Sequence, residues 1–195
     1  MSAALQEFAA HGFAGARVEA IARRAGLNKQ LISHHFGGKL ALFHAVMGER
    51  RLRGGGEMDG EPERFPDALG WFFDRGRNDP EWIRVLMWEA LESGEEEAGV
   101  AGLEARRARY QERVAWVEAE QAAGRLPSGL DPGLLFLTLI GAALYPVMLP
   151  DVCEIMTGLR PDSEEFATAY RNHLRQFATK FSNLSGVAEE PRPRG

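Results

Sequence analysis

The sequence predicts an all-α protein of about nine helices, divided into a small N-terminal domain and a larger C-terminal domain. Three observations lead to this prediction. Apolar residues recur at helical spacing, no alternation of apolar and polar residues is long enough for a β-strand, and two Asp-Pro pairs mark helix starts. The 195 residues, of which 45% are hydrophobic and 26% charged, are enough for one or two ordinary domains.

The distribution of charge divides the chain. Residues 1–53 carry eight Lys and Arg against three Glu, whereas the whole chain has a net charge of −5. Residues 54–63 combine glycines, charges and a proline without apolar periodicity, as in a linker. We therefore expect a basic domain over 1–53, a helical domain over 64–184 and a disordered tail over 185–195. Only the basic domain is expected to meet a polyanion, because local charge governs such binding.

Three short helices are predicted in the basic domain. The first covers residues 2–11 and ends at a glycine, and the second covers residues 18–25 and is closed by Gly26. The third covers residues 29–35, and Asn28 can cap its first turn. A fourth helix opens at Lys39.

The spacing within the second and third helices is typical of a helix-turn-helix. Ala22 is small where the two helices would cross, and Gly26 follows four residues later, where the turn needs a left-handed backbone. Leu31 or Ile32, together with Phe36, would face inward. Such a unit places its second helix in the major groove of DNA.

The outward side chains of this unit can contact bases and phosphates. Lysine can donate to guanine, glutamine can bond adenine through both its amide atoms, and serine or histidine can serve either bases or phosphates. The predicted DNA-binding residues are Arg17, Asn28, Lys29, Gln30, Ser33, His34, His35 and Lys39. For His35 a structural position between helices is the alternative.

Residues 7–46, EFAAHGFAGARVEAIARRAGLNKQLISHHFGGKLALFHAV, resemble the DNA-binding domain of the tetracycline-repressor (TetR) family of bacterial regulators. The resemblance rests on Phe8, Gly12 and Phe13, on IARRAG, on HHF and on the following lysine. Two positions depart from the family pattern. Ser33 stands where tyrosine is usual, and Ala16 stands where threonine is common and would cap a helix, at a cost of about 1 kcal/mol.

Catalysis and metal binding are not expected. Ser33, His34 and His35 are consecutive on one helix and point in different directions, so they form neither a nucleophilic triad nor a metal site. The chain has no phosphate-binding glycine loop and no metal motif, so we expect no cofactor.

Sequence signals for helix starts define the C-terminal domain. Asp79-Pro80 and Asp131-Pro132 each supply a cap followed by proline at the first helical position, and residues 162–165 resemble a capping box. Helices are predicted near residues 66–77, 80–92, 98–123, 132–149 and 162–183.

The last two predicted helices carry more apolar surface than one small subunit can cover, which suggests a homodimer through a four-helix interface. The resemblance implies the same pairing. The predicted interface residues are Leu137, Gly141, Leu144, Phe166, Tyr170, Leu174, Phe177 and Phe181. The alternative is that these side chains pack against residues 66–123 of their own chain.

Aromatic residues are dense in the middle of the chain, where the resemblance implies a pocket for a small-molecule effector. A largely apolar wall would suit an aromatic or lipophilic effector. The candidate wall residues are Trp71, Met87, Trp88, Tyr110 and Trp116. The alternative is that these side chains belong to the hydrophobic core.

Several features bear on location. A lone cysteine, Cys153, excludes an internal disulfide and favours a reducing cytoplasm. The N-terminus has no secretory pattern, and the longest apolar run, residues 133–149, is shorter than the ~20 residues of a bilayer crossing. We expect a cytoplasmic repressor, bound to the bacterial chromosome as a homodimer and released from a palindromic operator by its effector. The alternative is a helical adaptor for protein interactions, or a ligand-binding protein without specific DNA binding.

Overall fold

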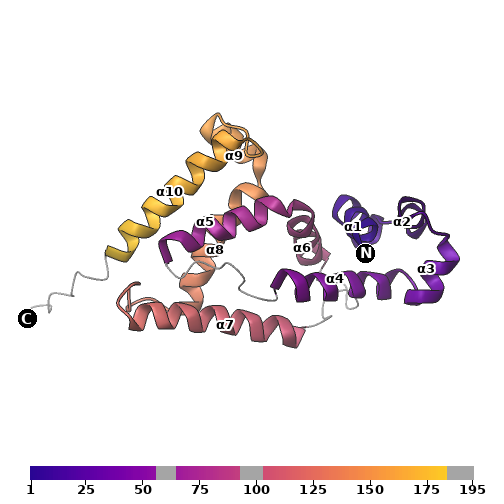
Figure 1. The fold of residues 1–195 in the computed structure, drawn as a ribbon, viewed down its shortest axis with the longest axis horizontal. Helices are drawn as coiled ribbons and strands as arrows, with labels where there is room; N and C mark the ends of the chain where they lie inside the picture. Colours follow the sequence, from indigo (N-terminus) through magenta and orange to yellow (C-terminus); the bar gives the residue numbers. More distant parts are fainter. Residues whose placement is uncertain (56–64, 93–102, 184–195) are drawn as a thin grey trace, which may run out of the picture. The chain divides into compact units, whose positions relative to one another are not determined.

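The computed structural model describes residues 1–55, 65–92 and 103–183, and these residues form helices and short connections without a β-strand (Figure 1). The all-α prediction is confirmed, with ten helices in place of about nine. They are α1 (Ser2–Gly15), α2 (Val18–Ala25), α3 (Lys29–Phe36), α4 (Lys39–Gly55), α5 (Phe65–Asn78), α6 (Pro80–Glu92), α7 (Leu103–Ala122), α8 (Pro132–Met148), α9 (Pro150–Thr157) and α10 (Glu164–Asn183).

The chain forms two compact units that are interleaved in sequence. The first unit contains Met1–Asp59 and Asn78–Ala108, and the second contains Gly60–Arg77 and Arg109–Gly195. The sequence predicted a single break at 54–63, but α4 runs through Gly55 and α6 belongs to the first unit. The rest of the predicted linker and the predicted tail lie outside the described residues.

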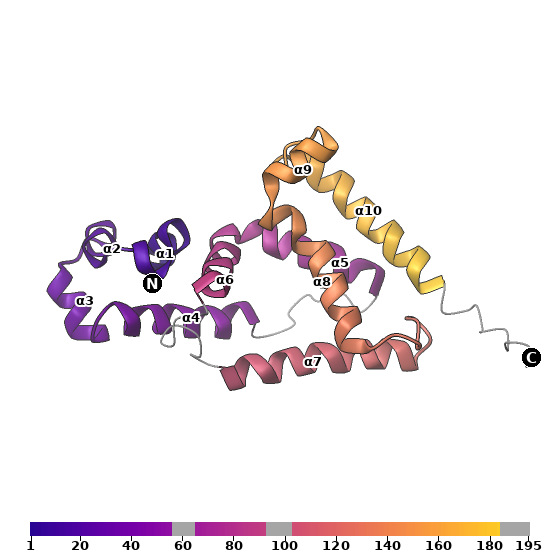
Figure 2. The same ribbon diagram turned by 180° about the vertical axis from the view of Figure 1, so that it is seen from behind.

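The first unit is built around α1. Phe8 is fully buried, and its ring meets Phe43 of α4 edge to face with 5.0 Å between ring centroids. Helix α6 lies beside α1 (Figures 1 and 2), where Val85 is fully buried and the indole N–H of Trp88 donates to the Ala9 carbonyl at 3.3 Å. Helix α6 is therefore part of the hydrophobic core that supports α1.

Helix α1 changes direction at a glycine. Gly12 has a φ of +66° inside α1, which confirms that the first helical segment ends there, and a further turn continues to Gly15. A positive φ at this position favours glycine, because other residues carry a Cβ that clashes with the backbone.

The second unit packs α5 and α8 with α10. The Phe73 ring lies 5.1 Å from the Tyr170 ring, and the Tyr170 hydroxyl donates to the Ala142 carbonyl at 2.7 Å. Ion pairs join α10 to α5 on the outside of this core, with Arg171 Nε 2.7 Å from Asp74 and Arg175 Nε 3.0 Å from Asp67. One face of the last helix therefore packs against its own subunit.

The predicted caps are confirmed, and one helix was missed. The side chains of Asp79, Asp131 and Ser163 accept backbone N–H groups at the starts of α6, α8 and α10. The prediction did not contain α9, which starts at Pro150 directly after α8 ends.

Among the described residues no single helix is long and apolar enough to cross a bilayer. Helices α8 and α9 reach that length and apolarity only as a pair, bent by 90° at the break between them.

Candidate nucleic-acid interface

Helices α2 and α3 are held together by a small buried contact and a tight turn. Ile21, Ala22 and Ile32 are all at least 96% buried. Gly26 ends α2 with a φ of +67°, and the amide of Leu27 donates to the Ala22 carbonyl at 2.9 Å. The predicted left-handed turn is therefore present.

The recognition helix α3 starts with the predicted cap. Asn28 Oδ1 accepts the amide of Leu31 at 2.7 Å, which satisfies one of the N–H groups left free at a helix start. The side-chain oxygen of Asn28 is thus used within the protein, whereas its NH2 group can still donate to DNA.

The outer face of α3 is open to solvent. Side chains that the sequence assigned to DNA are exposed along it: Lys29, Gln30, Ser33, His34 and His35. The alternative position for His35, between helices, is not observed, and its ring instead lies edge-on to the Phe36 ring with 4.6 Å between centroids. The face carries donors for guanine, an amide for adenine and histidines for phosphates.

The structure resolves which neighbour faces inward on α3. Ile32 is 4% exposed and Leu31 is 48% exposed. Leu31 and Leu27, which is 47% exposed, therefore add apolar side chains to the outer surface, and neither is among the predicted DNA-binding residues. Apolar side chains at such positions can read the methyl group of thymine.

Lys39 is engaged within the first unit. Its ammonium donates to the Ala14 carbonyl at 3.0 Å and lies 4.8 Å from the centroid of the Phe13 ring. The lysine therefore joins the start of α4 to the end of α1, in addition to any contact that it makes with a phosphate.

The start of α2 is supported from α1, and the expected cap position was wrong. Arg17, not Ala16, is the cap residue, and its side chain makes no capping hydrogen bond. Glu7 is 3% exposed, its Oε1 accepts the amide of Arg17 at 3.2 Å, and its Oε2 lies 3.6 Å from Arg24. A buried carboxylate from α1 thus binds at the N-terminal end of α2, where negative charge is favourable.

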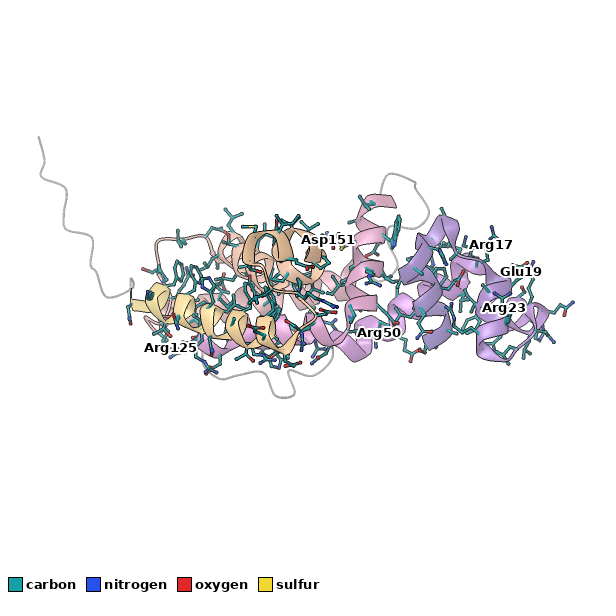
Figure 3. The ribbon with its side chains drawn as sticks, turned by 90° about the horizontal axis from the view of Figure 1, so that it is seen from above. Arg17, Glu19, Arg23, Arg50, Arg125 and Asp151 are labelled. Atoms are coloured by element: carbon teal, nitrogen blue, oxygen red, sulfur yellow. The ribbon has the colours of Figure 1, made fainter. Side chains whose placement is uncertain are left out.

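Basic side chains surround this surface. Arg17, Arg23 and Arg24 of the α2 region are exposed, and Figure 3 shows Arg17, Glu19 and Arg23 at the same end of the first unit. Glu19 is the acidic member, and its Oε1 lies 2.5 Å from the Lys29 ammonium. This surface can bind phosphates with its arginines and bases with α3.

The proposed effector wall is not brought together within one unit. Met87 and Trp88 belong to the first unit, where Trp88 bonds to α1, whereas Trp71, Tyr110 and Trp116 belong to the second. In the second unit, Trp71 and Trp116 pack against the hydrophobic core and Tyr110 is 49% exposed. Core packing therefore accounts for part of the predicted wall.

The predicted dimer residues divide into two groups. Phe166 and Leu174 are each 2% exposed and fill the core of their own subunit, so they cannot offer surface to a partner. Leu137 is 65% exposed and Phe177 is 42% exposed. Gly141 is also exposed, and partial exposure is found for Leu144, Tyr170 and Phe181.

Metal-binding groups and the thiol of Cys153 are the other candidates for chemistry in the described ranges. No group of three or more His, Cys, Asp or Glu side chains there is arranged to hold a metal ion. Cys153 is buried, and removal from water raises the pKa of its thiol. A raised pKa leaves less of the reactive thiolate at neutral pH.

Comparisons with known proteins cover both units. Residues 1–46 match the bacterial regulatory proteins of the tetR family, and residues 66–180 match the tetracyclin repressor-like C-terminal domain. The HTH-type transcriptional repressor SCO4008 of Streptomyces coelicolor is 36% identical over 157 residues, which are 80% of each protein.

Solved structures share the fold. SCO4942 from Streptomyces coelicolor has a TM-score of 0.71 at 26% identity, over 92% of this chain and 93% of that one. A TetR-like transcriptional regulator from Rhodococcus sp. RHA1 has a TM-score of 0.63 at 22% identity, over 95% and 93% of the two chains. Both domains match models of this family, and the chain is 36% identical to one of its repressors. The chain therefore belongs to the TetR family of DNA-binding bacterial regulators.

Proposed function

We propose that this regulator is a repressor that binds a palindromic operator as a homodimer and leaves it when a small aromatic or lipophilic effector binds. The observation that carries the proposal is the outer face of α3, which is polar, exposed and fixed in place by buried Ile32 and the Asn28 cap. The repressor named in the comparison, SCO4008, supports repression as the mode of action. Such a protein acts on the chromosome in the cytoplasm.

An exposed apolar stripe on α8 supports the homodimer. Its residues recur every three or four positions, so they lie on one face of the helix. They are Leu134, Leu137, Gly141, Tyr145 and Met148. A stripe of this kind fits the same stripe of a second copy across a two-fold axis, and two recognition helices then read two half-sites.

We infer that the effector binds in the second unit beside Trp71 and Trp116, which pack against the hydrophobic core but are only partly buried. The Trp71 ring lies 5.0 Å from the Phe72 ring, and Trp116 lies 6.1 Å from Phe65. An effector that binds one arrangement of the dimer better than another would shift the population away from the DNA-binding state.

Selection of bound duplexes from a random pool tests the proposal. We expect a palindrome whose half-site centres are separated by about 10 base pairs or a multiple, because two-fold related helices enter successive major grooves. Affinity for that palindrome should fall steeply as salt rises.

The same selection can contradict the proposal. A protein that enriched no sequence and showed no steep dependence of DNA affinity on salt would not be a repressor that acts at an operator. Aromatic and lipophilic compounds are then added to the operator complex, and an affinity that none of them changes would remove the switching claim alone.

A further inference from the structure

The surface that carries the recognition helix contains an acidic side chain beside its first basic one. Glu19 is the second residue of α2, and Lys29 is the first residue of α3. The Lys29 ammonium donates to Glu19 Oε1 at 2.5 Å, and both side chains remain more than half exposed, at 56% for Lys29 and 61% for Glu19. An ion pair therefore joins the two helices on the solvent side of the helix-turn-helix.

The position of Glu19 determines where Lys29 points. Glu19 lies six positions before Ala25, the last residue of α2, and this spacing is about 9 Å along the helix axis. Lys29 must therefore extend back towards the first turn of α2. A lysine free of this contact could instead follow any phosphate near the start of α3.

Glu19 is ionised at neutral pH. The hydrogen bond from Lys29 lowers the pKa of Glu19 below its ordinary value, with a smaller contribution from the charge of Arg17. A carboxylate on a surface that meets DNA repels phosphates, so Glu19 opposes general attraction to DNA.

We propose that Glu19 is a specificity-determining residue that holds the Lys29 ammonium for base edges and withholds it from phosphates. An ammonium has three N–H donors, so Lys29 can keep its bond to Glu19 and still donate to the O6 and N7 atoms of guanine. On DNA without the matching base, the paired lysine adds little, because its charge is already balanced. Glu19 thus lowers affinity for other DNA more than affinity for the operator.

The inference rests on the proposed operator binding, and its test compares two duplexes of equal length. One carries the palindrome obtained by selection, and the other carries the same bases in scrambled order. Dissociation constants are measured over a range of salt concentrations for the full-length protein, for Glu19→Gln, and for Glu118→Gln as the control. Glu118 is an exposed acidic residue of α7 in the second unit, so the control removes the same charge outside the helix-turn-helix.

Glu19→Gln should raise affinity for the scrambled duplex by about fivefold to tenfold near 0.1 M salt, because one more lysine then releases counterions. The slope of log affinity against log salt concentration should become steeper by about one for the scrambled duplex. Affinity for the operator should change by less than about twofold, because Lys29 loses its orientation as it gains mobility. Glu118→Gln should change neither the ratio of the affinities for the two duplexes nor the slope of log affinity against log salt concentration.

Two more variants test the role of Lys29. Glu19→Asp keeps the carboxylate and should keep the discrimination between the duplexes. In a Lys29→Gln background, Glu19→Gln should no longer change the ratio of the two affinities. Thermal melts followed by circular dichroism check that each variant is folded.

Several outcomes would overturn the inference. If Glu19→Gln raised affinity equally for both duplexes, Glu19 would act only through net charge. If it raised affinity for neither duplex, the ion pair would have no effect on DNA binding. A change of ratio that persists without Lys29 would separate Glu19 from that residue. Failure of the unaltered protein to prefer the operator is a different result, because it removes the proposed function itself.

Discussion

Leu31 and Ile32 are adjacent in α3 and similar in size and polarity, but they have different roles. Ile32 is 4% exposed and fills the contact with α2, whereas Leu31 is 48% exposed on the outer face. Apolar periodicity left the choice between them open, because an eight-residue helix contains too few apolar positions to define a face. The buried position of Ile32 settles the rotation of α3 about its axis.

This difference predicts opposite effects of two alanine substitutions. Ile32→Ala should lower the free energy of unfolding by about 2–5 kcal/mol, because it removes buried methylene groups and leaves a cavity. Leu31→Ala should change it by less than about 0.5 kcal/mol and should weaken preference for thymine at one operator position. Urea denaturation and binding to single-base operator variants measure these effects. Equal loss of stability in both variants would contradict the assigned orientation.

At the scale of elements, helix starts were predictable because their signals are local. Asn28, Asp131 and Ser163 each accept an N–H three residues ahead, so a few consecutive letters determine the cap. Helix α9 was missed because the apolar run of α8 leads straight into Pro150. Proline cannot donate the hydrogen bond that would continue α8, but it is well suited to the first position of the next helix.

The packing of elements was less predictable than their boundaries. The bounds of α6 agree with the predicted 80–92, yet its attachment to α1 depends on Trp88 reaching Ala9, 79 positions earlier in the chain. The contact between Glu7 and the start of α2 was equally unpredictable, because nothing in the sequence near Glu7 indicates it. Contacts at such separations follow from the tertiary fold and not from periodicity.

Two caps of similar geometry should be equivalent for stability and different for function. Asn28→Ala and Asp131→Ala should each lower the free energy of unfolding by about 1 kcal/mol, because each leaves a helix N–H unsatisfied. Only Asn28→Ala should also weaken operator binding, because it frays the first turn of α3. Thermal melts and operator titrations measure the two effects side by side. Loss of operator affinity in Asp131→Ala alone would contradict the assignment of α3 as the recognition helix.

At the scale of the whole molecule, the structure narrows the predicted dimer surface. Phe166 and Leu174 belong to the subunit core, so α10 offers less to a partner than its apolar stripe suggested. The exposed stripe of α8, with Leu137 at its middle, remains available. The sequence could identify an excess of apolar surface but could not divide it between the core and an interface.

Leu137→Asp should therefore dissociate the dimer. A charge placed in an apolar interface without a partner should cost about 3 kcal/mol, which raises the dimer dissociation constant more than a hundredfold. Light scattering after gel filtration measures the mass over a dilution series. Leu91→Asp is the control, because Leu91 is an equally apolar residue of α6 and is 76% exposed. A Leu137→Asp protein that stays dimeric on dilution would place the interface elsewhere.

The attachment of α6 to α1 limits how this protein can be dissected. An N-terminal fragment that stops before residue 78 would strip Val85 and Trp88 from α1 and leave apolar side chains bare. Such a fragment would be prone to aggregate, whatever its affinity for DNA. A chimaera that transplants the DNA-reading end onto another sensor must therefore carry α6 along with α1 to α4, as two pieces of chain.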